Sequence, residues 1–177
     1  MVSSAALPIF LIALVDVLAL TMMMPLLPFY AKSFGASAMQ VGMMFGVYAL
    51  CSLLAGPALG NLSDRHGRKP VLVLSQIGTF AGLVLMAYAP SLLIVFVARI
   101  IDGITAGNLT VAQSYLSDVS KPQDRTKVFA VIGIAFGIGF LIGPAATALI
   151  ATHWDERTAI LAAAGLSALS VCATLIL

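Results

Sequence analysis

The sequence predicts an all-α membrane protein whose chain crosses the bilayer six times. Of its 177 residues, 61% are hydrophobic and only 9% are charged, whereas an ordinary soluble domain carries roughly a quarter charged residues. Its apolar segments have the length of about 20 residues that a helix needs to cross a bilayer. They lack the alternation of polar and apolar residues that marks a membrane β-strand. Lipid offers no hydrogen-bond partner to unpaired backbone groups, and an α-helix satisfies these groups within itself. The segments are therefore predicted to be helices.

Six segments have the length and composition of membrane-spanning helices, and short connections join them within a single lobe, residues 1–177. Pro70 opens the third segment, and Pro90 separates the third from the fourth. The first segment is longer than a signal-peptide core and follows no Lys or Arg, so we expect it to be retained as a span. The expected spans are approximately residues 7–30, 41–62, 71–89, 92–116, 126–151 and 157–177.

The basic residues predict which side of the membrane each connection faces. Six of them lie in or beside the connections after the second and fourth spans, and only Lys32 and Arg157 lie in the opposite ones. The positive-inside rule therefore predicts that the N-terminus and both basic connections are cytoplasmic. No basic run has an aromatic platform beside it, so nucleic acid is not an expected partner. The six residues are Arg65, Arg68, Lys69, Lys121, Arg125 and Lys127.

A few polar side chains lie inside the predicted spans, where they are costly and tend to be functional. Asp16 is about ten residues into the first span, which at roughly 1.5 Å per residue is near mid-membrane. It has no opposite charge on its own helix, and such a carboxyl suits a proton carrier or a cation site. Arg99 and Asp102 share a helical face. They are either a pair that only neutralises itself or, with Asn108 and Gln113, part of a polar seam that lines a cavity.

Glycines recur at four-residue spacing on spans two to five. Such pairs let helix backbones approach closely in lipid, so we expect most of them to tighten the bundle. Cys51 and Cys172 match no metal or redox spacing, and we expect both to be packing residues. The glycine pairs are Gly42/Gly46, Gly56/Gly60, Gly78/Gly82, Gly103/Gly107, Gly133/Gly137 and Gly139/Gly143.

The connection from Gly60 to Pro70 is the most informative stretch. We expect a tight turn there, with Gly67 free to adopt a positive φ. A simple topology anchor would need the positive charges but not their order around one acid. This order resembles the signature of the major facilitator superfamily, Gly-x-x-x-Asp-Arg-x-Gly-Arg-basic. The matching residues are Gly60, Asp64, Arg65, Gly67, Arg68 and Lys69.

Two further stretches resemble motifs of the same family, in the same order along the chain. Arg99-x-x-x-Gly103 is similar to its fourth-span motif, and the run from Gly139 through Gly143 to Pro144 is similar to the motif of drug–proton antiporters. The stretches 102–108 and 114–118 are most similar to the tetracycline-efflux branch. The resemblance implies the N-terminal six-helix bundle of the family fold, built from two inverted three-helix repeats.

The resemblance also implies roles for particular residues. The acids and the arginine at the cytoplasmic end would form a charge relay, the in-span charges would couple proton and substrate, and the antiporter motif would bend span five and seal the cavity. Thr147 and Ala148 replace two glycines of that motif, which puts close packing there in doubt, and Asp102 would alter the role of Arg99. The relay residues are Asp64, Arg68 and Asp118, the coupling residues are Asp16 and Arg99, and the antiporter residues are Gly139, Gly143 and Pro144.

By this resemblance the chain is half of a secondary transporter and not an enzyme. The expected activity is export of drug-like amphipathic compounds, such as tetracycline-type substrates, through the plasma (inner) membrane. A proton gradient would drive it without a cofactor or metal. Expected partners are lipid, the substrate, and either a C-terminal six-helix half or a second copy of the chain. The alternative is a truncated or isolated lobe that serves only as an assembly subunit and transports nothing by itself.

Overall fold

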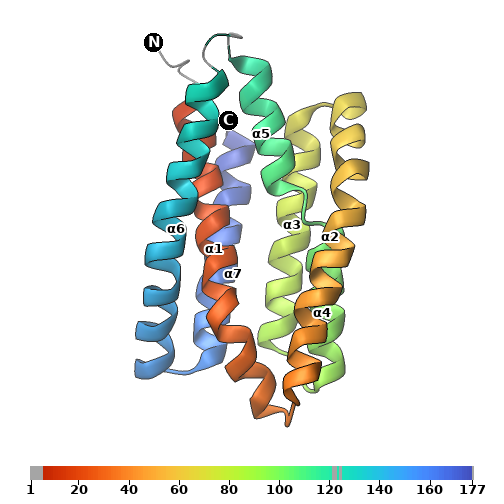
Figure 1. Ribbon diagram of the computed structural model, residues 1–177, viewed down its shortest axis with the longest axis vertical. Coiled ribbons are helices and arrows are strands. Elements are labelled where there is room, and N and C mark those ends of the chain that lie inside the picture. The colour runs from red at the N-terminus through yellow and green to blue at the C-terminus, as the bar shows by residue number, and fades with distance from the viewer. Residues whose placement is uncertain (1–5, 121–122, 124, 177) are drawn as a thin grey trace.

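The computed structural model describes residues 6–120, 123 and 125–176, and its helices lie side by side in an elongated bundle (Figure 1). Six of the described segments are long and apolar enough to cross a membrane, as the sequence predicted. Five of them are single helices and the fourth consists of two. The helices are α1 (Ala6–Ser33), α2 (Ala38–His66), α3 (Arg68–Ala87), α4 (Leu92–Ile104), α5 (Asn108–Val119), α6 (Arg125–His153) and α7 (Glu156–Ile176).

Local capping explains where α2 begins. The side chain of Ser37 accepts a hydrogen bond from the backbone N–H of Gln40 at 3.3 Å, and the Gln40 side chain accepts one from the Ser37 N–H at 2.9 Å. This reciprocal capping box satisfies two backbone donors that the helix leaves unpaired. It starts α2 three residues earlier than its apolar residues predicted.

The turn after α2 is shorter than the sequence suggested. Helix α2 continues through His66, and α3 already begins at Arg68. Gly67 alone reverses the chain, with φ at +93°, so the predicted positive φ is confirmed. Pro70 falls in the first turn of α3, where its missing N–H costs no helical hydrogen bond.

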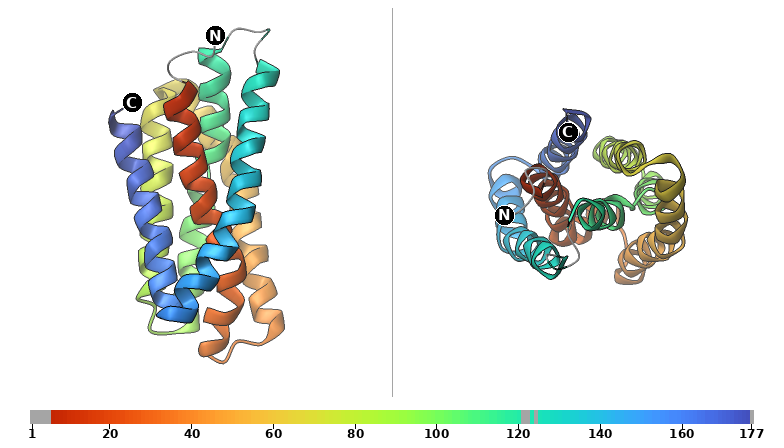
Figure 2. Two further views of the ribbon diagram at one scale, coloured as in Figure 1. Left: turned by 90° about the vertical axis from the view of Figure 1, so that its left-hand side faces the viewer. Right: turned by 90° about the horizontal axis from the view of Figure 1, so that it is seen from above.

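The helix contacts show two three-helix repeats. Helix α1 packs against α6 and α7 in the same way that α4 packs against α2 and α3, and α3 packs against α7. Exchanging the first three spans with the last three therefore maps these contacts onto one another. The first and fourth spans run in opposite directions, so the repeats are inverted, as the family resemblance implied. Figure 2 shows this arrangement from the side and along the bundle axis.

The fourth span is broken, and the prediction of one continuous helix over 92–116 was wrong. Helix α4 ends at Ile104 and α5 begins at Asn108. The Ser75 hydroxyl of α3 donates to the backbone carbonyl of Thr105 and accepts from the backbone N–H of Gly107, the latter at 2.8 Å. A side chain from a neighbouring helix thus satisfies backbone groups that the break leaves without helical partners. The break is tolerated at membrane depth because these groups have this partner.

Only some of the glycine pairs tighten the bundle. A Cβ atom on Gly143 would lie 2.8 Å from the Cβ of Thr21, and one on Gly139 would lie 2.5 Å from a methyl group of Val17. Helix α6 therefore needs glycine against α1. The expectation was wrong for the pairs on α2 and for one pair on α6, where an added Cβ would meet no described atom within 4 Å. These pairs are Gly42/Gly46, Gly56/Gly60 and Gly133/Gly137.

Gly143→Ala and Gly137→Ala test this distinction on one helix. Alanine at 143 would collide with Thr21, and overpacking of this kind costs about 1–3 kcal/mol. Alanine at 137 meets open space and gains helix propensity, so it should be neutral or stabilising by up to about 1 kcal/mol. Unfolding of the purified variants in mixed detergent micelles measures both. Equal effects would show that α1 and α6 do not pack as closely as described.

Candidate functional site

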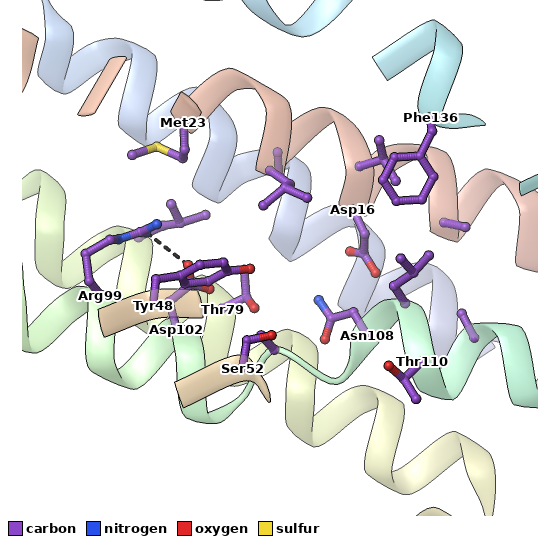
Figure 3. Close-up of a pocket in the computed structure, with 18 residues that line it drawn as sticks. Asp16, Met23, Tyr48, Ser52, Thr79, Arg99, Asp102, Asn108, Thr110 and Phe136 are labelled. Carbon is purple, nitrogen blue, oxygen red and sulfur yellow. Dashed lines mark ion pairs between the residues drawn. The ribbon is translucent and has the colours of Figure 1, made fainter. Parts of the chain in front are cut away.

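A cavity of about 210 Å³ lies between the two repeats, with walls from α1 through α6. In Figure 3, Asp16 and Asn108 point toward one another at one end of the cavity, and Arg99, Asp102, Tyr48 and Thr79 gather at the other. Asp16, Arg99, Asp102 and Asn108, which the sequence singled out, thus all line this cavity. The predicted Gln113 is half-buried on α5 and is not among the described residues that line this cavity.

Asp16 is held by amide and hydroxyl groups of other spans. Gln76 of α3 donates from Nε2 to Asp16 Oδ2 at 3.2 Å, and the same nitrogen donates to the hydroxyl of Ser170 on α7 at 2.7 Å. Gln76 and Ser170 are fully buried. Neither residue was predicted from the sequence, although Gln76 is the single amide side chain in its predicted span and polar groups in membrane helices seek partners on other helices.

Arg99 and Asp102 form an ion pair, with 3.0 Å between Nη2 and Oδ2. Their side chains are only 5% and 8% exposed, so the pair is withdrawn from water. The Arg99 guanidinium also lies over the ring of Tyr48, 5.5 Å from its centroid. Its Nε finds no hydrogen-bond partner among the described residues. The two side chains thus neutralise each other and also line the cavity.

Asn108 marks the break in the fourth span. It is the first residue of α5, and its Oδ1 is buried without a hydrogen-bond partner in the described part of the chain. The break places Asn108 on a different helix from Arg99 and Asp102, so the polar groups do not form a seam along one helix. They meet because α4 and α5 both face the same cavity.

A second cluster lies at the end of the bundle where α1 begins and α7 ends (Figure 1). Arg68 is 2.5 Å from Asp64 through Nη1 and 2.7 Å from Asp118 through Nε. Its Nη1 also donates to Ser63 at 2.7 Å. The guanidinium thus ties the α2–α3 turn to the end of α5.

The neighbouring motif residues play different structural parts. Lys69 donates to the backbone carbonyl of Leu175 at 2.9 Å, which ties α3 to the end of α7. Arg65 is exposed, and Gly60 precedes Ser63, whose hydroxyl donates to the Gly60 carbonyl at 2.7 Å. The predicted basic residue Lys121 lies outside the described residues.

The antiporter-like stretch packs along α1. Thr21 donates to the carbonyl of Gly139 at 2.9 Å, and Thr147 donates to the carbonyl of Met22 at 2.9 Å. Thr147 is buried where the family motif has glycine, so a cross-helix hydrogen bond keeps the helices together at that end; Ala148 faces outward. Helix α6 runs as one helix through Pro144.

Comparison with known proteins identifies the family of the chain. The chain belongs to the Major Facilitator Superfamily, whose sequence profile matches residues 9–177. It is 37% identical over 139 residues to the class H tetracycline resistance protein of Pasteurella multocida, covering 77% of this chain and 35% of that protein. It is 33% identical over 165 residues to the bovine (Bos taurus) major facilitator superfamily domain-containing protein 10, covering 77% and 36%.

A solved structure has the same fold. The crystal structure of the human organic anion transporter MFSD10 (TETRAN) superimposes with a TM-score of 0.84 at 25% identity, over 97% of this chain and 46% of that one. The match covers about a third of the length of the curated relatives described above. These findings define an integral membrane protein of a transporter family.

The buried ion pair gives a prediction on stability. Asp102→Leu leaves the Arg99 charge buried and unpaired, which should cost roughly 3–5 kcal/mol, whereas the double variant Arg99→Met/Asp102→Leu should lose much less. Unfolding free energies in mixed micelles measure both. A double variant that loses as much stability as Asp102→Leu alone would contradict a direct interaction between the two side chains.

Proposed function

We propose that this chain forms the N-terminal lobe of a proton-coupled exporter of drug-like amphipathic compounds. One contrast supports this most directly. The cavity holds two carboxyl groups, and Asp102 has Arg99 as its counter-ion while Asp16 has no ion-pair partner within the described ranges. An uncompensated carboxyl at membrane depth is costly and needs a functional reason.

Asp16 suits exchange of a proton for a cation. Its neutral form is compatible with the surrounding apolar side chains, and its charged form requires a positive partner. A proton and the cationic group of a substrate both satisfy that requirement, and one carboxyl cannot hold both. Loading one therefore promotes release of the other, which is the reciprocal coupling that an antiporter needs.

The Arg99 end of the cavity completes a site for a substrate with mixed polarity. Its unpaired Nε is a donor for an oxygen atom of the substrate, and Tyr48 and Phe136 supply aromatic surface. We infer a cationic or zwitterionic substrate of the tetracycline type. The relatives whose names mention tetracycline resistance and the organic anion transporter support a substrate with ionisable groups.

The Arg68 cluster suits a gate at the cytoplasmic surface. Its two carboxylates hold α2, α3 and α5 in one arrangement, and releasing them would let the repeats move against each other. We place this end and the N-terminus in the cytoplasm, and the lobe in the plasma (inner) membrane. The second half of the cavity would come from a C-terminal six-helix lobe or a second copy of the chain, with no cofactor beyond the proton gradient.

Asp16→Asn tests the proposal in proteoliposomes that contain the purified chain. A pH gradient should drive accumulation of a fluorescent cationic dye, and Asp16→Asn should reduce it to the level of empty vesicles because the amide cannot exchange a proton. Asp155→Asn is the control. Hydrogen bonds from the Thr158 side chain and backbone hold the pKa of the exposed Asp155 below its ordinary value, and asparagine preserves this helix cap.

Three results separate the alternatives. Flux that survives Asp16→Asn would refute the carrier role of Asp16. A chain that binds the dye with an Asp16-dependent affinity but moves none would show that the chain by itself does not transport and that transport requires the other half of the cavity. A chain that neither binds nor transports the dye would contradict the proposed substrate class.

A further inference from the structure

Gln76 occupies an unusual position at the centre of the lobe. Its side chain is fully buried between α1 and α7, and its Nε2 serves two acceptors, Asp16 Oδ2 at 3.2 Å and Ser170 Oγ at 2.7 Å. Ser167 donates to the Gln76 backbone carbonyl at 3.3 Å, which fixes the start of the side chain. Three spans therefore converge on one amide group.

The other amide atom is unsatisfied. Gln76 Oε1 is buried with no hydrogen-bond partner in the part of the chain that the structure describes. A buried acceptor without a partner costs about 1–3 kcal/mol, and such an atom calls for an explanation. A leucine would fill the same space without that cost.

A change of protonation at Asp16 would give this spare acceptor a use. As a carboxylate, Asp16 only accepts hydrogen bonds, and the Gln76 N–H group meets this need. As a neutral acid, Asp16 gains an O–H donor and needs an acceptor. A half-turn of the terminal amide of Gln76 exchanges Nε2 and Oε1, and this places an acceptor in front of both Asp16 and Ser170. The Ser170 hydroxyl is then able to donate rather than accept.

We propose that Gln76 is a positioning residue for Asp16 and that its side-chain amide rotates by half a turn when the carboxyl gains or loses its proton. The proton reaches Asp16 from the cavity, and Gln76 itself neither takes up nor releases one. In either orientation one of the two amide atoms has hydrogen-bond partners and the other has none. The rotation therefore leaves no additional buried polar atom without a partner. The inference rests on the proposed role of Asp16 as the proton-exchanging carboxyl.

The other ionisable groups around Asp16 do not replace Gln76. Arg99 and Asp102 of α4 and Tyr48 of α2 share its cavity, but they gather at the opposite end (Figure 3). The cavity-lining residues that α3, α5 and α6 contribute in the described chain carry no charge. On α7 the contact residue is Ser170. Gln76 is the amide side chain that donates a hydrogen bond to the carboxyl in the described chain. The Asn108 amide also points toward Asp16 (Figure 3), and its Oδ1 has no partner among the described residues.

Infrared difference spectroscopy tests the inference on the purified chain in lipid nanodiscs, without requiring transport. Spectra taken on either side of the Asp16 titration should contain its carboxylic C=O band, which Asp16→Asn removes. They should also contain a side-chain amide band. This band should shift when the glutamine side chains are labelled with ¹⁵N, and Gln76→Leu should remove it. In Gln76→Leu the Asp16 band should move to higher wavenumber because its hydrogen bond is lost.

Ser167→Ala is the matched control, because Ser167 contacts the backbone of Gln76 and not its amide. It should leave both bands in place. An Asp16 band without any isotope-sensitive amide band would overturn the positioning role while leaving proton exchange at Asp16 intact. The absence of an Asp16 band would overturn both proposals. The isotope experiment needs no variant, so misfolding of Gln76→Leu leaves the test decisive.

Discussion

Lipid offers no hydrogen bonds, and this constraint organises the interior of the protein. Polar side chains inside a span therefore favour partners on another span or on their own helix backbone. Thr21 and Thr147 therefore bond α1 to α6, and Tyr30 donates to the carbonyl of Met86 at 2.7 Å to bond α1 to α3. Apolar packing alone discriminates weakly among helix arrangements in a membrane, so these bonds and the close glycine contacts specify which helices meet.

The same constraint explains how the fourth span is interrupted. A break at mid-membrane frees backbone N–H and C=O groups, and water cannot take them. Ser75 serves as partner to both sides of the break, while Thr105 donates back to Ile101 at 2.8 Å. The interruption separates Asn108 from the Arg99–Asp102 pair and turns both toward one cavity. A continuous helix would have spread these groups around its circumference.

The two carboxyl groups of the cavity have different surroundings. Asp102 is neutralised three residues from its partner, so its charge is internally balanced. Among the described residues Asp16 has dipolar partners such as Gln76 and no counter-ion. The glycine pairs of α2 and the Gly133/Gly137 pair of α6 have no described atom within 4 Å of an added Cβ. They lie on the outside of the lobe, where small residues allow another helix to approach closely.

The sequence by itself determined the class of protein, the six spans and the motif residues, because span length, charge bias and local turn chemistry are short-range properties. Gly67 is an example, since a single residue reverses the chain there. Only the tertiary structure revealed the break at residues 105–107, the contact of Gln76 with Asp16, and which glycines face inward. Each of these depends on a partner from a span distant in sequence, such as Ser75 for the break or Thr21 for Gly143, and no local pattern specifies that partner.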